Sequence, residues 1–312
     1  MSLRNTAAMR GIAVALLCQC AACVTPGPEP TKPRSDTLIA QASVAARLAY
    51  ERGDFGQARQ LYRQALTRAR AVDDAGLAAD AAYNLAISEI ALGNYAVAEQ
   101  LLPEAVYDAG RAASATDDIL LLRAKVAYLR EQLPEALAIA SVVADSRAAL
   151  ALRLQAMLLR GHIFCERGEL APARSELQRV QGLGAAADAK LPPAIRADRA
   201  KLEGMIARLE GNLAAAAGLF DSEAELLRRA HRYRDMGYAL ARVADAYLAA
   251  GQPDLAADRY YLAARSLDAR GEHATAQAFL ASSLAAADKA GKQNARERAL
   301  SLLDEISRRA GP

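Results

Sequence analysis

From about residue 37 onward, apolar residues recur at a helical period that a short turn motif interrupts at regular intervals. They return every three to four positions, as on one face of an α-helix. Each run ends in a glycine, or one substitute, with an alanine five positions later. The motif occurs at Gly53–Ala58, Gly93–Ala98, Glu131–Ala136, Gly168–Ala173, Gly211–Ala216 and Gly251–Ala256. These alanines are 40, 38, 37, 43 and 40 residues apart, and such a period predicts a helical solenoid.

The residues around each turn have a clear local role. Glycine readily takes the left-handed conformation that ends a first helix. Asp54, Asn94 and Asn212 are placed to cap the start of a second helix. Pro134 and Pro253 fall in the first turn of that helix, where no backbone donor is lost. We expect the recurring alanine to lie where two helices touch, so that a larger residue would overpack the contact.

Together these residues resemble the tetratricopeptide repeat, a helix–turn–helix unit with small and aromatic residues at fixed places. The small first-helix position holds Ala46, Ala86, Ala124, Gly161, Gly204 and Ala244, and the large second-helix position holds Tyr62, Phe220 and Tyr260. Phe55 and Tyr95 match the aromatic residue after the turn. The resemblance implies an all-α, right-handed solenoid of about seven repeats over residues 37–310. Its period of about 40 residues, against about 34 in the standard repeat, indicates the long-repeat type.

The N-terminus, residues 1–22, is typical of a bacterial lipoprotein signal peptide. Arg4 and Arg10 precede an apolar run of about a dozen residues, which is too short to span a bilayer as a helix. Ala21 and Ala22 directly before Cys23 resemble a lipobox, which implies acylation of the Cys23 thiol. By the sorting rule of such lipoproteins, Val24 implies the outer membrane. The alternative is an ordinary cleaved signal that leaves Cys23 as a free thiol.

Residues 23–36 are rich in proline and predict an extended tether rather than a folded segment. Cys18 and Cys20 would leave with the signal, and Cys23 would carry lipid. Cys165 would then stand alone, so the exported chain would be stabilised by packing without a disulfide.

Composition narrows the possible functions. Apolar residues make up 53% of the chain but aromatic residues only 5%, so much of the apolar content is alanine, which favours thin helical layers. The net charge is +3, and the signal peptide supplies two of those charges, so nucleic acid is not an expected partner. No nucleophile, phosphate-loop or metal motif is present in the sequence. His162 and Cys165 share a helical face without evident further ligands. We expect no enzymatic activity, no cofactor and no metal.

Binding residues are expected on the concave face formed by the first helices. The repeat register nominates Arg47, Tyr50, Tyr83, Asn84, Lys125, Tyr128, His162, Lys201, Arg208, Tyr238 and Arg242. Asn84 occupies the place where peptide-binding members carry the asparagine that holds a ligand's backbone amide, but the other copies lack it. The face therefore contains only part of a peptide clamp. The alternative is a solvated groove with incidental tyrosines.

The sequence thus predicts a lipid-anchored scaffold or adaptor in the cell envelope that faces the periplasm. Its partner would be an extended or helical segment of another envelope protein. The machine it serves could be outer-membrane assembly, a pilus or secretion apparatus, or a cell-wall synthase, and the fold alone does not choose among them. Two alternatives stay open: a glycan- or peptidoglycan-binding module, and a soluble periplasmic chaperone-like adaptor.

Overall fold

The computed structural model describes residues 37–182 and 190–310, and these residues form fourteen α-helices. The helices pair consecutively across the turns predicted from sequence. The first helices of the pairs are α1 (Thr37–Glu51), α3 (Ala75–Ala91), α5 (Asp117–Leu129), α7 (Leu150–Glu166), α10 (Pro193–Leu209), α12 (Tyr233–Ala249) and α14 (His273–Ala290). The second helices are α2 (Phe55–Ala71), α4 (Tyr95–Arg111), α6 (Leu133–Ala144), α8 (Leu170–Gln181), α11 (Leu213–Arg229), α13 (Pro253–Asp268) and α15 (Gln293–Ala310). The prediction of an all-α solenoid of about seven helix pairs is confirmed.

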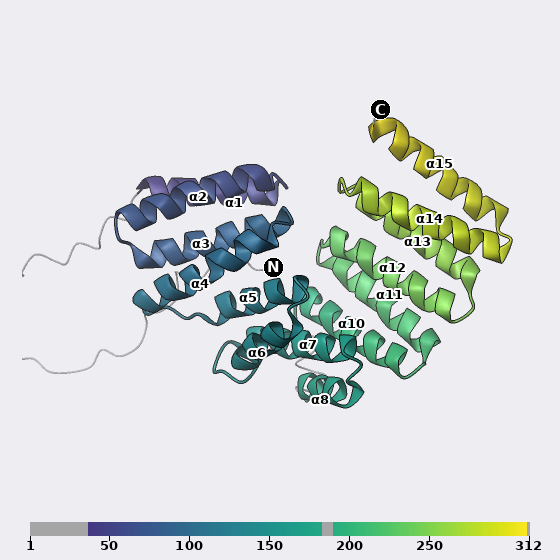
Figure 1. Ribbon diagram of the computed structural model, residues 1–312, viewed down its shortest axis with the longest axis horizontal. Coiled ribbons are helices and arrows are strands. Elements are labelled where there is room, and N and C mark those ends of the chain that lie inside the picture. Colours follow the sequence, from purple (N-terminus) through teal and green to yellow (C-terminus); the bar gives the residue numbers. More distant parts are fainter. Residues whose placement is uncertain (1–36, 183–189, 311–312) are drawn as a thin grey trace, which may run out of the picture.

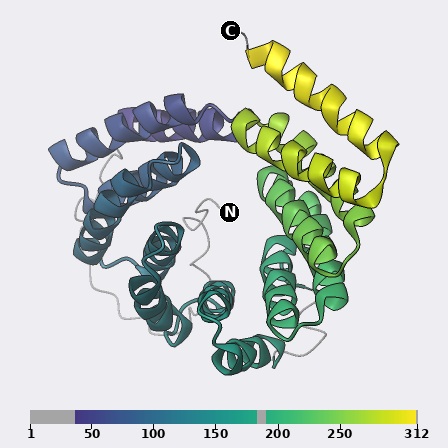
Figure 2. The same cartoon turned by 45° about the vertical axis from the view of Figure 1, so that its right-hand side comes forward.

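The pairs stack in chain order and curl around (Figures 1 and 2). The N-terminal arm, α1–α4, and the C-terminal arm, α10–α15, are joined through the bend formed by α5–α8. The apolar core is a series of clusters along the array instead of one central mass. Within the described ranges, no helix combines the length and the apolar character needed to cross a membrane.

The turns have the predicted left-handed residues and two of the three predicted helix caps. Glycines 53, 93, 168, 211, 251 and 271 all have φ between +72° and +83°. Glu131 takes the same left-handed place in the degenerate third copy, with φ +62°, although a side chain there costs about 1–2 kcal/mol. Asp54 and Asn212 accept hydrogen bonds from the backbone N–H groups of Gln57 and Ala215 and so cap their helices.

The predicted cap at Asn94 is wrong. Asn94 precedes α4, but its side chain makes no capping hydrogen bond. Its Nδ2 instead donates to Oε2 of Glu89 at 2.8 Å. Glu89 is 1% exposed, and its other oxygen accepts from Arg63 at 3.2 Å. A buried carboxylate needs such donors more than the helix end needs a cap.

Small residues form the contacts between helices. The six aligned alanines at positions 58, 98, 136, 173, 216 and 256 are all 0% exposed. In two first helices, α7 and α10, the neighbouring helix lies so close that only glycine fits. A Cβ added at Gly161 would meet Cδ2 of Leu202 at 2.6 Å, and one at Gly204 would meet Cε1 of Phe220 at 2.6 Å. We call these aligned alanines and the small first-helix residues the small-residue seam.

The seam predicts a sharp difference between two neighbouring alanines of α11. Ala216 is fully buried, whereas Ala215 is exposed. Ala216→Leu should lower the free energy of unfolding by about 1–3 kcal/mol through overpacking. Ala215→Leu adds the same atoms at the surface and should change it by less than about 0.5 kcal/mol. Denaturant unfolding measures both variants, and equal stability of the two would show that the seam is misplaced.

Candidate functional site

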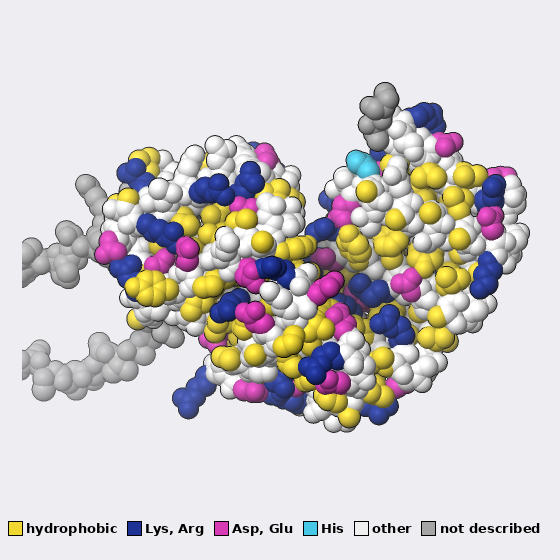
Figure 3. Space-filling view, in the orientation of Figure 1, with side chains coloured by type: hydrophobic (Ala, Val, Ile, Leu, Met, Phe, Trp, Pro, Cys, Tyr) yellow, Lys and Arg dark blue, Asp and Glu magenta, His cyan; other side chains and the backbone are white. Residues whose placement is uncertain are grey.

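Polar side chains from successive first helices meet at the inner side of the bend. α5 supplies Lys125 and Tyr128, α7 supplies His162 and Glu166, α10 supplies Asp198 and Lys201, α12 supplies Arg242, and Glu223 comes from α11. Contacts join most of them: the Tyr128 hydroxyl to Glu166, the His162 ring to the backbone oxygen of Asp198, Arg242 to Glu223, and Lys201 to the ring of Tyr128. The charge of Asp198 also acts on the pKa of Lys125. We call these eight residues the inner-face cluster. Figure 3 shows basic and acidic side chains interspersed near the middle of the face that it draws.

The strongest contact in the inner-face cluster is an ion pair between Arg242 and Glu223. Arg242 donates from Nη2 to Oε1 of Glu223 at 2.5 Å and from Nε to Oε2 at 3.2 Å. The Glu223 side chain is only 4% exposed and that of Arg242 is 25% exposed. Burial raises the pKa of Glu223 above its ordinary value of 4.5, and the charge and hydrogen bond of Arg242 oppose that rise. This pair joins α11 to α12.

Two lysines of the cluster have no carboxylate partner at ion-pair distance among the described residues. Nζ of Lys125 donates to Oε1 of the neutral Gln155 at 2.7 Å. Nζ of Lys201 lies 5.8 Å from the ring centroid of Tyr128. Burial lowers the pKa of both ammonium groups, although both side chains keep partial contact with solvent. The charges of Asp198, Glu166 and Glu223 act on these lysines from farther away. Because neither ammonium group has a carboxylate at ion-pair distance, both can still pair with a ligand that brings negative charge.

His162 is held in its neutral form. It is 5% exposed, and its Nε2 lies 3.0 Å from the backbone oxygen of Asp198, so the ring N–H donates to that carbonyl. Burial first, and then the charge of Lys201, lower the pKa of His162 well below 6.5. One turn further along α7, burial raises the pKa of the Cys165 thiol to about 11. The described part of the chain contains no group of three or more metal-ligating side chains.

Tyr128 is fixed by its neighbours. Its hydroxyl donates to Oε1 of Glu166, which ties α5 to α7. Burial and this hydrogen bond raise the pKa of Tyr128. The tyrosine therefore remains protonated and serves as a rigid donor and apolar surface next to Lys201.

The structure brings together only part of the predicted groove. Lys125, Tyr128, His162, Lys201 and Arg242 meet in the inner-face cluster. The nominated residues outside the cluster are Arg47, Tyr50, Tyr83 and Asn84, which belong to α1 and α3, and Arg208 and Tyr238.

Arg208 is exposed near the end of α10. Tyr238 is directed toward the next repeat: its hydroxyl donates to Glu272 at 2.6 Å and its ring lies edge-on to Phe279.

Asn84 donates from Nδ2 to the backbone oxygen of Asp80 at 2.8 Å, and its buried Oδ1 has no hydrogen-bond partner. Because that oxygen is closed to solvent, a ligand reaches it only if the side chain turns.

Sequence reasoning missed three members of the cluster, Glu166, Asp198 and Glu223. The register counted back from each turn glycine nominated selected positions of the first helices, whereas Glu223 belongs to a second helix. Its burial was not visible in the sequence because the neighbouring residues of α11 include both apolar and acidic side chains.

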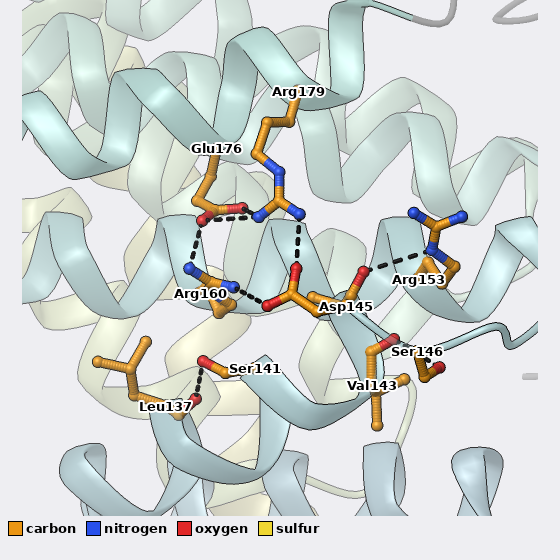
Figure 4. Close-up of polar contacts among 10 residues, drawn as sticks. Leu137, Ser141, Val143, Asp145, Ser146, Arg153, Arg160, Glu176 and Arg179 are labelled. Atoms are coloured by element: carbon orange, nitrogen blue, oxygen red, sulfur yellow. Dashed lines mark hydrogen bonds and ion pairs between the residues drawn. The ribbon is translucent and has the colours of Figure 1, made fainter.

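A second polar network, drawn in Figure 4, holds the bend itself. Arg160 of α7 lies 2.7 Å from Oε1 of Glu176 and 3.6 Å from Oδ2 of Asp145. Arg179 of α8 joins the same two carboxylates at 3.1 and 2.8 Å. Glu176 is 3% exposed, and burial raises its pKa against the effect of both arginines. The network links α7 and α8 to the end of α6, so it stabilises the part of the fold on which the inner-face cluster stands.

The Arg242–Glu223 pair predicts a specific stability effect. Arg242→Ala leaves a buried carboxylate unpaired and should lower the free energy of unfolding by about 3–5 kcal/mol at neutral pH. The double variant Arg242→Met/Glu223→Leu, which removes both charges, should recover most of that loss.

The deficit of Arg242→Ala should also depend on pH. Without the arginine, the folded-state pKa of Glu223 should rise further above 4.5. A raised folded-state pKa penalises the folded state as pH rises through that pKa, so the deficit should shrink as pH falls from neutral toward 4.5 and level off below 4.5, where the carboxyl is protonated in both states. Chemical denaturation across pH measures this, and a deficit that grows on acidification would contradict it.

Comparison with known proteins identifies the fold. No protein-family model and no curated protein sequence matches the chain. Among solved structures, a Rap protein complexed with competence and sporulation factor is similar with a TM-score of 0.59 and 14% identity, over 90% of this chain and 89% of that one. A signal transduction ATPase with numerous domains and a tetratricopeptide repeat sensor, PH0952 from Pyrococcus horikoshii, has a TM-score of 0.57 and 17% identity, over 85% of this chain and 41% of that one. A tetratricopeptide repeat protein from Parabacteroides merdae has a TM-score of 0.50 and 14% identity, over 85% and 99%. The chain therefore has the fold of a tetratricopeptide-repeat solenoid.

Proposed function

We propose that this protein is a scaffold or adaptor that binds a segment of another protein on its inner face, and that it has no catalytic role. The observation that carries the proposal is the pair Lys125 and Lys201, two half-buried cations of the inner-face cluster that have no carboxylate of the described residues at ion-pair distance. In contrast, the other cation of the cluster, Arg242, is paired with Glu223. The similarity of this fold to that of a Rap protein complexed with competence and sporulation factor supports a binding role.

The chemistry of the inner face indicates the kind of segment that would bind. Lys125 and Lys201 favour an acidic side chain or a free carboxylate, because charge-assisted hydrogen bonds are stronger than neutral ones. The amide of Asn84 both donates and accepts, so it would hold an extended chain without reading its sequence once the side chain turns its buried Oδ1 toward the groove. The proposed partner is therefore an extended segment with acidic character.

A glycan-binding role is less well supported. Sugars bind on open aromatic faces, but the tyrosines here are engaged. Tyr50 packs against Phe55 with ring centroids 5.0 Å apart, and Lys201 lies over the ring of Tyr128. Tyr238 packs edge-on against Phe279. The structure thus favours a protein segment over a carbohydrate as the ligand.

We further propose that the protein works in the cell envelope, attached to the outer membrane through lipid on Cys23 and facing the periplasm. Cys23 and the tether lie outside the described residues, so this proposal rests on the sequence alone. Several acyl chains at one cysteine would give stable anchoring, since each buried CH₂ contributes about 0.8 kcal/mol. The partner would then be a component of an envelope machine, such as outer-membrane assembly, a pilus or secretion apparatus, or a cell-wall synthase. If Cys23 carries no lipid, a soluble periplasmic adaptor is the alternative.

The binding proposal is tested with two lysine pairs. Lys125→Ala/Lys201→Ala should weaken capture of the partner in a crosslinking pull-down from envelope fractions. Truncating a binding hot spot costs at least about 2 kcal/mol, or about thirtyfold in affinity. Lys289→Ala/Lys292→Ala changes two exposed lysines at the turn between α14 and α15 and is the matched control. If both double variants, each shown to be folded by circular dichroism, capture the same proteins as the wild type, the inner face is not the binding surface.

Membrane attachment is tested separately. Cys23→Ser should move the protein from the membrane pellet to the soluble fraction and abolish incorporation of labelled palmitate. Cys165→Ser, which changes a buried thiol of α7, is the control and should leave both unchanged. A wild-type protein that takes up no fatty acid, or a Cys23→Ser variant that still sediments with membranes, would refute lipid anchoring at this residue.

A further inference from the structure

The first helix of the array has an apolar outer side. α1 packs on α2 and touches α3, and no helix precedes it among the described residues. Three of its large apolar side chains are exposed: Leu38 by 50%, Val44 by 49% and Leu48 by 42%. With about 3.6 residues per turn, these three lie on one side of the helix together with Gln41 and Ala45. That side of α1 carries no charged residue.

The other end of the array is different. Terminal repeats of a solenoid need a polar outer face to stay soluble. α15 has such a face, because its exposed side chains are all polar, among them Glu297, Asp304 and Arg308. None of the exposed large apolar residues of the described chain belongs to α15. The apolar outer side of α1 therefore marks a surface for interaction rather than a general property of the array ends.

A groove of about 730 Å³ lies between α1 and α2 beside this apolar side. Leu38 and Ala42 of α1 form one wall. Arg63 and Arg68 line the other wall together with uncharged residues of α2, and no acidic side chain lines the groove. The groove thus combines apolar surface with positive charge. We call the outer side of α1 and this groove the end face.

Positive charge is concentrated in the first repeat. Residues 37–71 contain six arginines and two acidic residues, whereas residues 72–312 contain 29 basic and 32 acidic ones. α2 alone has four arginines and no acid. Arg63 pairs with Glu89 and Arg70 with Glu104, yet the two arginine side chains remain 61% and 45% exposed. Figure 3 shows several basic side chains over α1 and α2.

The position of the end face selects its partner. Residues 23–36 join Cys23 to the start of α1 and, even fully extended, span about 50 Å at most. Lipid on Cys23 would therefore hold the first repeat, more closely than any later one, near a bilayer. An anionic membrane surface offers phosphates to the arginines and an apolar layer to the leucines.

A second copy of the chain fits the end face less well. A two-fold contact places the same surface on both sides. Arg63 and Arg68 of one copy would then face the same arginines of the other, with no acidic residue in the groove to separate them. Like charges opposed in this way disfavour the contact.

We propose that the end face seats the protein on a membrane that contains anionic phospholipids. Leu38, Val44 and Leu48 enter the boundary between headgroups and acyl chains, and Arg63 and Arg68 contact phosphate. The nearness of the bilayer rests on the lipid anchoring proposed above, whereas the affinity of the end face for headgroups does not. Later repeats then lie farther from the bilayer, and the inner-face cluster stays available to the protein partner.

Vesicle binding of purified residues 24–312 tests the end face alone, because this chain keeps every described helix and carries neither leader nor lipid. It should sediment with vesicles of phosphatidylglycerol and phosphatidylcholine, less so as salt is added, and not with phosphatidylcholine alone. Arg68→Gln should weaken binding about fivefold. Leu48→Ser should weaken it severalfold, because less apolar surface is buried in the membrane.

Matched variants at other sites are the controls. Arg308→Gln changes an exposed arginine of α15, and Leu255→Ser changes a leucine of α13 that is 42% exposed, as Leu48 is. Both should bind like the unchanged chain, and circular dichroism first shows that every variant is folded. Equal binding to both kinds of vesicle, or equal loss in the two members of either pair, would overturn the proposal. Self-association that Leu48→Ser abolishes, without any vesicle binding, would also overturn it and assign the end face to a second copy. Since this chain carries no lipid, the result is independent of whether Cys23 is acylated.

Discussion

The close approach of helices at the small-residue seam is the constraint on which the rest of this structure depends. The six aligned alanines between paired helices have no solvent exposure. At Gly161 and Gly204 even a Cβ would meet a neighbouring side chain at 2.6 Å. Because such contacts are close-packed, each helix pair has little freedom in how it sits on the next. The small rotation between successive pairs therefore accumulates in one direction, as in other solenoids.

That accumulated rotation creates the candidate site. The cluster residues are far apart in the sequence, from Lys125 to Arg242, and the curl places them on one inner surface. The same curl buries their charges, so Glu223 needs Arg242 and His162 stays neutral. Lys125 and Lys201 are the exception because no carboxylate neutralises them at ion-pair distance. Binding capacity thus follows from how the repeats stack and needs no dedicated loop.

The sequence predicted what depends on local chemistry. The left-handed glycines, the buried alanines and the caps at Asp54 and Asn212 each follow from a few adjacent residues, and the structure has them. Asn94 failed as a cap because a buried carboxylate, Glu89, competes for its amide. The groove was predicted only in part. The register indicated which helix face a side chain occupies but not how strongly the array curls. It therefore did not predict the burial of Glu223 or the contact of Tyr238 with the next repeat.

The central claim is that the stacking of the repeats buries a polar cluster at the inner face, and the most direct measurement is an NMR titration of His162. The chain has three histidines, and His231 and His273 lie outside the inner-face cluster and serve as references. The account predicts that the ring signals of His162 do not change as the pH passes through 6.5 and that His162 titrates only well below it. A His162 that titrates at its ordinary value of 6.5 would contradict the account, because the ring would then be solvated and the cluster not assembled.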